Sequence, residues 1–395
     1  MNNQRFIYGY IALIFLMIFL YGASSQAIGT LITRIIEHYS IRMAQAGLLS
    51  SFTSAGNFAA IFIITIFVGR INKMILLGAC LFLSGVSLCL ISVAPPFSII
   101  LICFALIGVF GATVDTLANS LVADLMPANV SRNMSFLHGF YGLGGLCGPI
   151  FMDRLAGMLD WTQVYFFVSI AFFVYVMIYI LFVRWQWNFL KVCLSLEKQA
   201  RIGFYDVIKF FNKKRHLLLW LAMLFYGGNQ STMVVWIKRY VEAHLNVPAM
   251  SAYALSAMWL GIAISRLLIS PGIKASSLVK ICVGNFIAAI ALTAGLLSGS
   301  AYGIMTASLI VGLSSGFTIP LIIAMGCEWN PERTAYGTMM TFMALFIAYF
   351  LFPPLSGLIG DFIGIPWGVA IGAVSATITA VIAVLLNTTL KSEEA

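Results

Sequence analysis

The sequence is poor in charged residues. Asp, Glu, Lys and Arg make up 9% of its 395 residues, whereas about a quarter of the residues in an average soluble domain are charged. Hydrophobic residues make up 61%, and they form blocks of about 20, separated by short turns that carry Gly, Pro, Lys and Arg. Alternation of polar and apolar residues at every second position, which marks a membrane β-barrel, is absent. The composition excludes an ordinary soluble domain and predicts a helical protein that crosses the membrane many times.

The sequence also lacks the residue groups of a metal site, a disulfide framework or a hydrolytic centre. Its seven cysteines form no CxxC pair, and three of its four histidines lie outside the apolar blocks. We therefore expect no disulfide, no metal and no cofactor. No nucleophile and base lie at a plausible spacing, so an enzyme is not expected.

Twelve apolar blocks are long enough to span a bilayer. They cover residues 6–31, 44–68, 74–94, 97–125, 133–152, 163–183, 217–236, 251–270, 278–297, 302–326, 335–357 and 367–387. The first block is too long for the apolar region of a signal peptide. We predict an all-α membrane protein of twelve transmembrane helices, with an N-terminal half at 1–183, a linker at 184–216 and a C-terminal half at 217–395.

The basic residues predict the orientation of these helices. With a cytoplasmic N-terminus, the inside segments hold 16 of the 22 Lys and Arg residues and the outside loops hold five. This bias places both termini in the cytoplasm and accounts for the net charge of +9 without a nucleic-acid partner. The basic linker, with its interspersed phenylalanines, either lies on the anionic inner leaflet or is a solvated connector. We expect a monomer in the cell (inner) membrane.

The two halves of the sequence repeat each other. "YGASSQAIGTLITRIIE" begins at Tyr21 and "YGGNQSTMVVWIKRYVE" begins at Tyr226, and four identities between them share an offset of 205. Two prolines and a tryptophan continue the match at nearly the same offset. The repeat predicts two six-helix halves in the same orientation, with a solute site expected between them near the midplane and rocking between inward-open and outward-open states.

A carboxyl group lies deep in the fourth block, in "GVFGATVDTLANSLV". Asp115 is roughly 18 Å along the helix from Pro127, more than half of a ~30 Å hydrocarbon layer. A charged Asp at the bilayer centre costs roughly 2.5–3.5 kcal/mol on insertion scales. Such a group can carry a proton if it is charged when wet and neutral when occluded. Asn119, four residues on, lies on the same helix face and can hydrogen-bond it. The alternative is a hydrogen bond from Asp115 to a neighbouring helix.

His138 and Arg266 are candidates for a gating or relay role. His138 lies in the fifth block, where it acts either as a proton relay or as a hydrogen-bonded packing residue. Arg266, in "WLGIAISRLL", either snorkels to the inner interface or forms a gate contact or counter-charge between the halves.

Uncharged polar groups in the first and seventh blocks are candidates for solute binding. Gln26, Asn229 and Gln230 lie beside Gly residues, and buried amides suit hydroxyl-rich ligands because they both donate and accept hydrogen bonds. Trp236 either stacks on a sugar face or belongs to the interfacial aromatic belt. The Gly residues of the fifth block, in "GFYGLGGLCG", predict close helix packing.

The sequence resembles the fucose permease-like sugar:proton symporters of the major facilitator superfamily. The resemblance is carried by "AQAGLLSS", "VDTLANSLVADLMP", "YGGNQSTMVVWIKRYVE", "GIAISRLL", Pro320 with "AYGTMM" beyond it, and "PPLSGLIGDFIG". It implies proton coupling at Asp115, which matches the family acid that precedes Asn by four residues. It also implies solute contact at Gln230. One family member has a further acid in the first helix, where this sequence has Gly29 or a neighbour.

These observations together favour a secondary transporter that moves a small polar solute, a sugar or polyol, with protons. Asp115 would be the coupling carboxyl, and the solute contacts would be Gln26, Asn119, Asn229, Gln230 and Trp236. One alternative is an exporter of amphipathic compounds, since the chain is rich in the Met and Phe that suit adaptable apolar contacts. Another is a membrane sensor or scaffold that does not transport.

Overall fold

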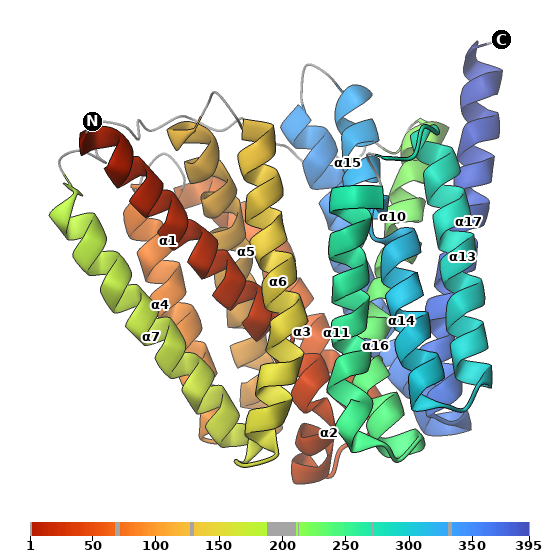
Figure 1. Cartoon of the computed structure of the whole chain (residues 1–395), viewed down its shortest axis with the longest axis horizontal. Helices are drawn as coiled ribbons and strands as arrows, with labels where there is room; N and C mark the ends of the chain where they lie inside the picture. Colours follow the sequence, from red (N-terminus) through yellow and green to blue (C-terminus); the bar gives the residue numbers. More distant parts are fainter. Residues whose placement is uncertain are drawn as a thin grey trace. The chain divides into compact units, whose positions relative to one another are not determined.

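The computed structural model describes residues 2–67, 72–126, 130–187, 211, 213–269, 272–330 and 334–394. Every regular element in these ranges is a helix (Figure 1). The elements are α1 (Asn2–Ser25), α2 (Ala27–Tyr39), α3 (Met43–Phe67), α4 (Lys73–Ser92), α5 (Phe97–Leu125), α6 (Val130–Ala156), α7 (Trp161–Trp185), α10 (Lys214–Arg239), η2 (Tyr240–His244), α11 (Pro248–Ile264), η3 (Ser265–Ile269), α13 (Ser277–Leu297), α14 (Ala301–Ser315), α15 (Thr318–Glu328), α16 (Thr334–Ile363) and α17 (Ile365–Glu394). Most of the predicted linker lies outside the described residues.

The helices confirm the prediction of an all-α protein with many membrane-spanning segments. Each predicted apolar block coincides with one helix or with two consecutive helices. Within the described ranges, nine helical stretches are long and apolar enough to cross a membrane. The helices α3, α6 and α10 are not among these nine, and α6 and α10 are the more polar ones.

Two of the predicted helices are broken. The block 6–31 is not one helix, because α1 ends at Ser25 and α2 continues from Ala27 to Tyr39. At the break the Gln26 backbone N–H donates to Ala23 O at 3.2 Å, a bond to the third residue back instead of the fourth. The second break separates α14 from α15. Hydropathy averaged over a whole span does not register such breaks, because the helices on both sides are apolar.

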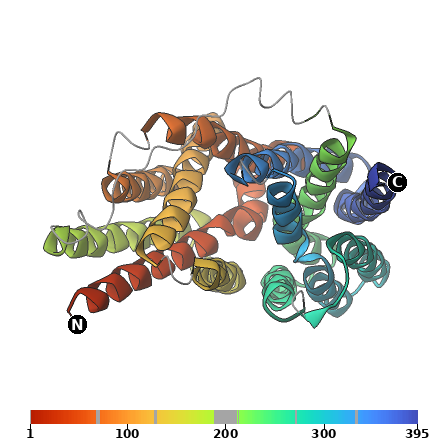
Figure 2. The ribbon, with the colours of Figure 1, turned by 90° about the horizontal axis from the view of Figure 1, so that it is seen from above.

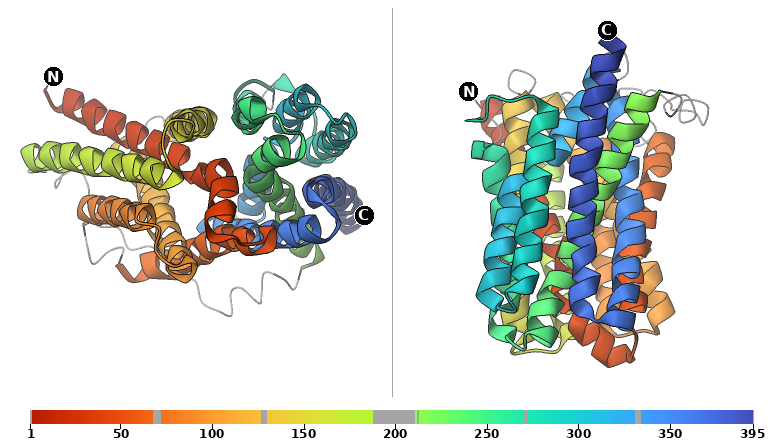
Figure 3. Two further views of the ribbon diagram at one scale, coloured as in Figure 1. Left: turned by 90° about the horizontal axis from the view of Figure 1, so that it is seen from below. Right: turned by 90° about the vertical axis from the view of Figure 1, so that its right-hand side faces the viewer.

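The chain folds into two compact units. Unit 1 comprises Met1–Ala27 and Phe52–Arg201, and unit 2 comprises Ile28–Ser51 and Ile202–Ala395. In unit 1, α1 packs on α6, and α4 packs on α5 and α7 (Figure 2). In unit 2, α10 packs on α16 and α17, and α13 lies along α14 and α17 (Figure 3). Unit 2 therefore contains α2 and the start of α3. In the sequence these are separated from the rest of unit 2 by Phe52–Arg201, which belongs to unit 1.

Close backbone contact places α2 against α10 within unit 2. A Cβ atom on Gly29 would collide with the carbonyl oxygen of Val234. A side chain of any size at position 29 would therefore push the two helices apart. This contact gives a physical reason why Gly29 and not an acidic residue stands here.

The start of α3 is bound to α16 through an irregularity of α16. Pro353 and Pro354 have no N–H to donate to the carbonyls one turn earlier in the helix. The Ser50 hydroxyl donates to Tyr349 O at 3.1 Å, and the Ser51 hydroxyl donates to Phe350 O at 2.5 Å. The two serines of α3 thus supply the hydrogen bonds that the prolines remove.

Candidate functional site

Asp115 lies well inside α5, about 15 Å along the helix from the end at Leu125. Its side chain is half-buried. The Asn119 amide donates to the backbone oxygen of Asp115 at 2.7 Å, and its side chain also hydrogen-bonds the Asp115 carboxyl. Asn119 therefore orients both the helix backbone and the acid, as its spacing of four residues suggests.

Tyr21 brings α1 against the same face of α5. A Cβ atom on Gly111, one turn before Asp115, would lie 2.6 Å from the Tyr21 hydroxyl oxygen. The hydroxyl therefore occupies the space that a side chain at position 111 would fill, and Tyr21 lies within electrostatic range of Asp115. A phenol beside a carboxyl can donate a hydrogen bond to it.

The glycines of α6 set the distance between α6 and α1. A Cβ atom on Gly144 would collide with the carbonyl oxygen of Phe19, so the two backbones approach too closely for any other residue. This contact confirms that the Gly-rich stretch serves close packing. It also fixes the two polar residues of α6 that lie less than two turns before it, His138 and Tyr141.

Tyr141 joins α6 to the break between α1 and α2. Its ring meets that of Tyr21 edge to face, with centroids 5.9 Å apart. Its hydroxyl lies 3.1 Å from Ser25 Oγ, and the Gln26 amide donates to the same Ser25 oxygen at 2.8 Å. Gln26 is thus buried within a polar network instead of facing lipid.

His138 is a basic residue that interacts electrostatically with Asp115. It lies on α6 with an exposed ring, and it acts on the charge of Asp115. We call the set formed by Tyr21, Ser25, Gln26, Asp115, Asn119, His138 and Tyr141 the Asp115 cluster. The carboxyl, the imidazole and the phenols can each accept and release a proton, and the amides can bind hydroxyl groups.

The three residues of α10 that were predicted to bind solute have side chains buried between helices. The Asn229 amide donates to Gly372 O of α17 at 2.9 Å. The Trp236 indole, 0% exposed, donates to Pro353 O of α16 at 3.0 Å. Gln230 is also buried. In this arrangement Trp236 has no free ring face for a solute, and Asn229 and Trp236 hold α10 against its neighbours.

Arg266 lies in η3, a π-helical turn that continues α11. Its Nε donates to Gly316 O at 3.0 Å, in the break between α14 and α15. Tyr226 of α10 lies within electrostatic range of the guanidinium and is hydrogen-bonded to Ser315. The charge is therefore held inside unit 2, at the depth of the helix break.

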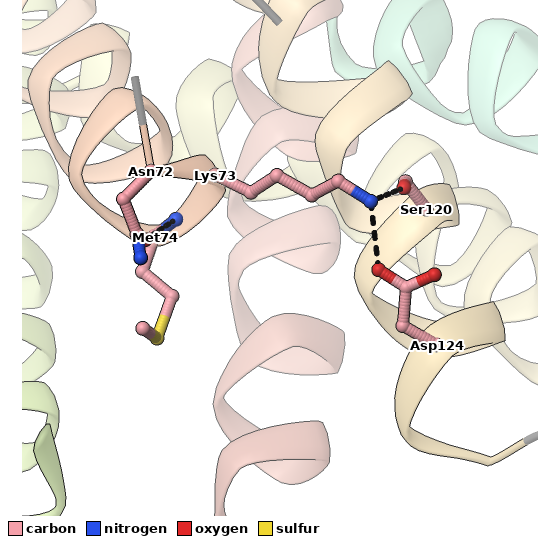
Figure 4. Close-up of polar contacts among 5 residues, drawn as sticks. All are labelled: Asn72, Lys73, Met74, Ser120 and Asp124. Atoms are coloured by element: carbon pink, nitrogen blue, oxygen red, sulfur yellow. Dashed lines mark hydrogen bonds and ion pairs between the residues drawn. The ribbon is translucent and has the colours of Figure 1, made fainter. Parts of the chain in front are cut away.

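An ion pair in unit 1 ties the start of α4 to the end of α5 (Figure 4). The Lys73 ammonium is 2.8 Å from both Asp124 Oδ2 and Ser120 Oγ. Asn72 caps α4 by accepting from the Met74 N–H at 2.8 Å. Asp124 therefore joins the end of α5 to the start of α4 and is not part of the Asp115 cluster.

Several residues of these groups were not foreseen from the sequence. Tyr21 and Tyr226 marked the repeat, but their roles as polar neighbours of a charge depend on which helices meet. Nothing in the sequence around Tyr141 or Ser315 distinguishes them from the other polar residues of an apolar block. Within the described residues, no three His, Cys, Asp or Glu side chains gather to hold a metal ion.

Comparison with known proteins agrees with the helical arrangement. Residues 14–277 match the family model described as Major Facilitator Superfamily. No curated protein matches the chain. Among solved structures, the chain is similar to a bacterial homolog of the human lysosomal transporter Spinster in its inward-facing, unoccupied conformation. That match has a TM-score of 0.70 at 15% identity and covers 96% of this chain and 95% of the other. The occupied inward-facing form gives a TM-score of 0.67 at 15% identity, covering 96% of each chain. These likenesses show the fold.

Proposed function

Because the chain belongs to the Major Facilitator Superfamily, we propose that it is a proton-coupled secondary transporter of a small polar solute, of the sugar or polyol class. Residues 1–183 and 217–395 form its two six-helix halves, which alternate between inward-open and outward-open states. Both termini lie in the cytoplasm, and the protein works as a monomer in the cell (inner) membrane.

The observation that carries this proposal is the environment of Asp115. An ionisable residue inside a membrane segment marks an ion or proton path by default, because its burial is expensive. Here the carboxyl is half-buried, hydrogen-bonded by Asn119 and faced by His138 and Tyr21. This set supplies a site that gains and loses a proton, with a neighbour that can pass it on.

The solute is bound beside the proton site. Asn119 supplies an amide next to Asp115, Gln26 supplies one beside Ser25, and Gln230 supplies one on α10. Asn229 and Trp236 act on the solute site by holding α10 in place, through their bonds to Gly372 and Pro353. Protonation of Asp115 removes its charge, which makes occlusion of the acid from water less costly. Solute and proton are thereby moved together.

The test measures the uptake of a panel of labelled sugars and polyols by proteoliposomes that contain the protein. For a transported solute, Asp115→Asn is expected to abolish uptake driven by a pH gradient while retaining solute exchange across the membrane. Asp160→Asn, which removes an exposed acid at the start of α7, serves as the matched control and retains both. Full pH-driven uptake by Asp115→Asn would refute the coupling role. Absence of counterflow for every solute would favour a sensor.

A further inference from the structure

Unit 2 contains a charge that the proposed coupling mechanism does not use. Arg266 is half-buried on a membrane-spanning stretch, Pro248–Ile269. It lies in a π-helical turn, a feature that is frequent at functional sites. The neighbouring Ser265 hydroxyl is buried and has no hydrogen-bond partner in the part of the chain that is described.

The guanidinium is held by a backbone carbonyl inside unit 2. Its Nε donates to Gly316 O at 3.0 Å, and Gly316 is about 18 Å along the helix from Glu328, where α15 ends. The carbonyl is accessible to Arg266 because the helix is interrupted between Ser315 and Thr318. The Nε of Arg266 is bound to this carbonyl, and Arg266 itself stands three residues before the end of its spanning stretch at Ile269.

No acidic side chain neutralises this cation within the described ranges. Ion pairs there include Lys73–Asp124 and Lys238–Glu242, and Arg266 belongs to neither. A guanidinium has five N–H donors, and Gly316 O accepts from one of them. Withdrawing a charge from water without a counter-charge is unfavourable, and Arg266 is half-withdrawn from it. The remaining donors are therefore placed to receive an anion.

The sequence repeat gives the second, independent observation. The offset of 205 relates Tyr21 to Tyr226 and Gly111 to Gly316. In unit 1 the Tyr and Gly of this framework lie beside the carboxyl of Asp115. In unit 2 the equivalent Tyr and Gly lie beside the guanidinium of Arg266. The two units thus carry opposite charges on the same framework.

We propose that Arg266, Tyr226 and Ser315 form an oxyanion site that binds the carboxylate of the transported solute, an acidic sugar or related hydroxy acid. The proposal rests on the proposed transport function and narrows its solute class. The terminal N–H groups of the guanidinium can hold a carboxylate in a two-pronged hydrogen bond, which is about twice as strong as a neutral one. The Tyr226 hydroxyl supplies a further donor. A neutral sugar would leave the guanidinium unsatisfied.

The experiment measures thermal stabilisation of the full chain in phosphatidylcholine nanodiscs. The probes are D-glucuronate, D-galacturonate and D-gluconate, each compared with its neutral counterpart D-glucose, D-galactose or D-glucitol. At least one acid is expected to raise the Tm with a saturable dependence on its concentration, and its neutral counterpart is not. Arg266→Gln is expected to abolish this shift. Arg266→Lys, which keeps the charge but loses the planar fork, is expected to weaken apparent binding by about tenfold. Arg184→Gln removes an exposed arginine of α7 and is expected to leave the shift unchanged.

Three results would overturn the proposal. They are no shift with any acid, an equal shift with the neutral counterparts, or an unchanged shift in Arg266→Gln. Should that variant fail to fold, Arg266→Lys and Tyr226→Phe take its place, and unaltered affinity in both has the same meaning. If phosphatidylglycerol in the nanodisc raises the Tm through Arg266 and the acids do not compete with it, the site binds a lipid headgroup, and the proposal is wrong.

Binding is measured here without a proton gradient. If the wild-type protein shows no pH-driven uptake but keeps the Arg266-dependent shift in Tm, the coupling mechanism is wrong and the oxyanion site stands. Retention of the shift in Asp115→Asn is expected, because asparagine keeps the size and hydrogen-bonding capacity of the side chain and the carboxylate of the probe is bound by Arg266.

Discussion

The carboxylate of Asp361, near the end of α16, caps the first turn of α3 at Met43. Its Oδ1 accepts a hydrogen bond from the Met43 N–H at 3.0 Å, and its Oδ2 accepts one from the Ala44 N–H at 2.9 Å. The first N–H groups of a helix have no partner within the helix, and a negative charge there is favoured by the helix dipole. One side chain near the end of the chain thus holds the start of a helix that precedes it by most of the sequence.

Loss of this cap is expected to loosen the start of α3. Asp361→Ala removes both acceptors, at a cost of about 0.5–2 kcal/mol. Amide hydrogen exchange at Met43 and Ala44 should then accelerate by a factor of about 2–30, measured by mass spectrometry on the peptide that contains them. Asp160→Ala, which removes the capping box at the start of α7, is the matched control and should leave that peptide unchanged. Equal acceleration in both variants would indicate general destabilisation and not a local cap.

His138→Gln is expected to change the pH dependence of uptake. Glutamine keeps a hydrogen-bonding side chain but cannot be protonated near neutral pH. If His138 exchanges protons with Asp115, the variation of uptake with pH should be smaller than in the wild type, because one proton-exchanging group is removed, while the KM for solute changes by less than about threefold. His38→Gln, at an exposed position in α2, should retain the wild-type profile. A wild-type profile in His138→Gln would leave His138 with a packing role.

Gly144→Ala is expected to destabilise the protein and to reduce transport. The added methyl group collides with the Phe19 carbonyl, and forcing extra volume into a packed contact costs about 1–3 kcal/mol. It also moves Tyr141 and His138 away from α1. Gly139→Ala, on the same helix, is the control because a Cβ atom there meets nothing within 4 Å. A lower Tm in Gly144→Ala, with an unchanged or higher Tm in Gly139→Ala, is the expected result, and equal Tm values would contradict the contact.

The Lys73–Asp124 pair is expected to be strongly coupled. Asp124→Asn leaves the ammonium of Lys73, which is 8% exposed, without its counter-charge, at a cost of about 1–3 kcal/mol. Lys73→Met leaves the acid, which is better hydrated, and should cost less. In the double variant the loss should be smaller than the sum of the two single losses, because no lone charge remains. Tm values of the four proteins complete the cycle, and additive losses would show that the two side chains do not depend on each other.

The sequence was sufficient to predict the helical segments, apart from the breaks at Gln26 and between α14 and α15, because they depend on local hydropathy. It was also sufficient to place Asp115 well inside one of them, because a carboxyl group is out of place in an apolar block. Trp236 shows the limit of such reasoning. An aromatic residue near a helix end suits a sugar face or a membrane interface equally well, and the structure instead directs its N–H to Pro353 O. That choice depends on a helix more than a hundred residues away.

The neighbours of Asp115 and Arg266 could not be predicted either, because they too come from helices that are distant in the sequence. Tyr21 reaches Asp115 because Gly111 leaves room for its ring, and Arg266 reaches Gly316 because a helix is broken there. Each relation joins elements that are distant in sequence. The repeat offset of 205 contained part of this information, since it matches both tyrosines and both glycines.

Because of the prolines in α16, α3 can separate from α16 only if water reaches the carbonyl groups that its serines now bind. Tyr349 and Phe350 have carbonyls that receive hydrogen bonds from Ser50 and Ser51, and α16 itself has no N–H to replace them. If α3 moves away, two oxygen atoms are left without donors, and each costs several kcal/mol in a dry membrane layer. A state in which these helices part must therefore admit water to this place, so the rate of parting should fall when water activity is lowered by an excluded osmolyte.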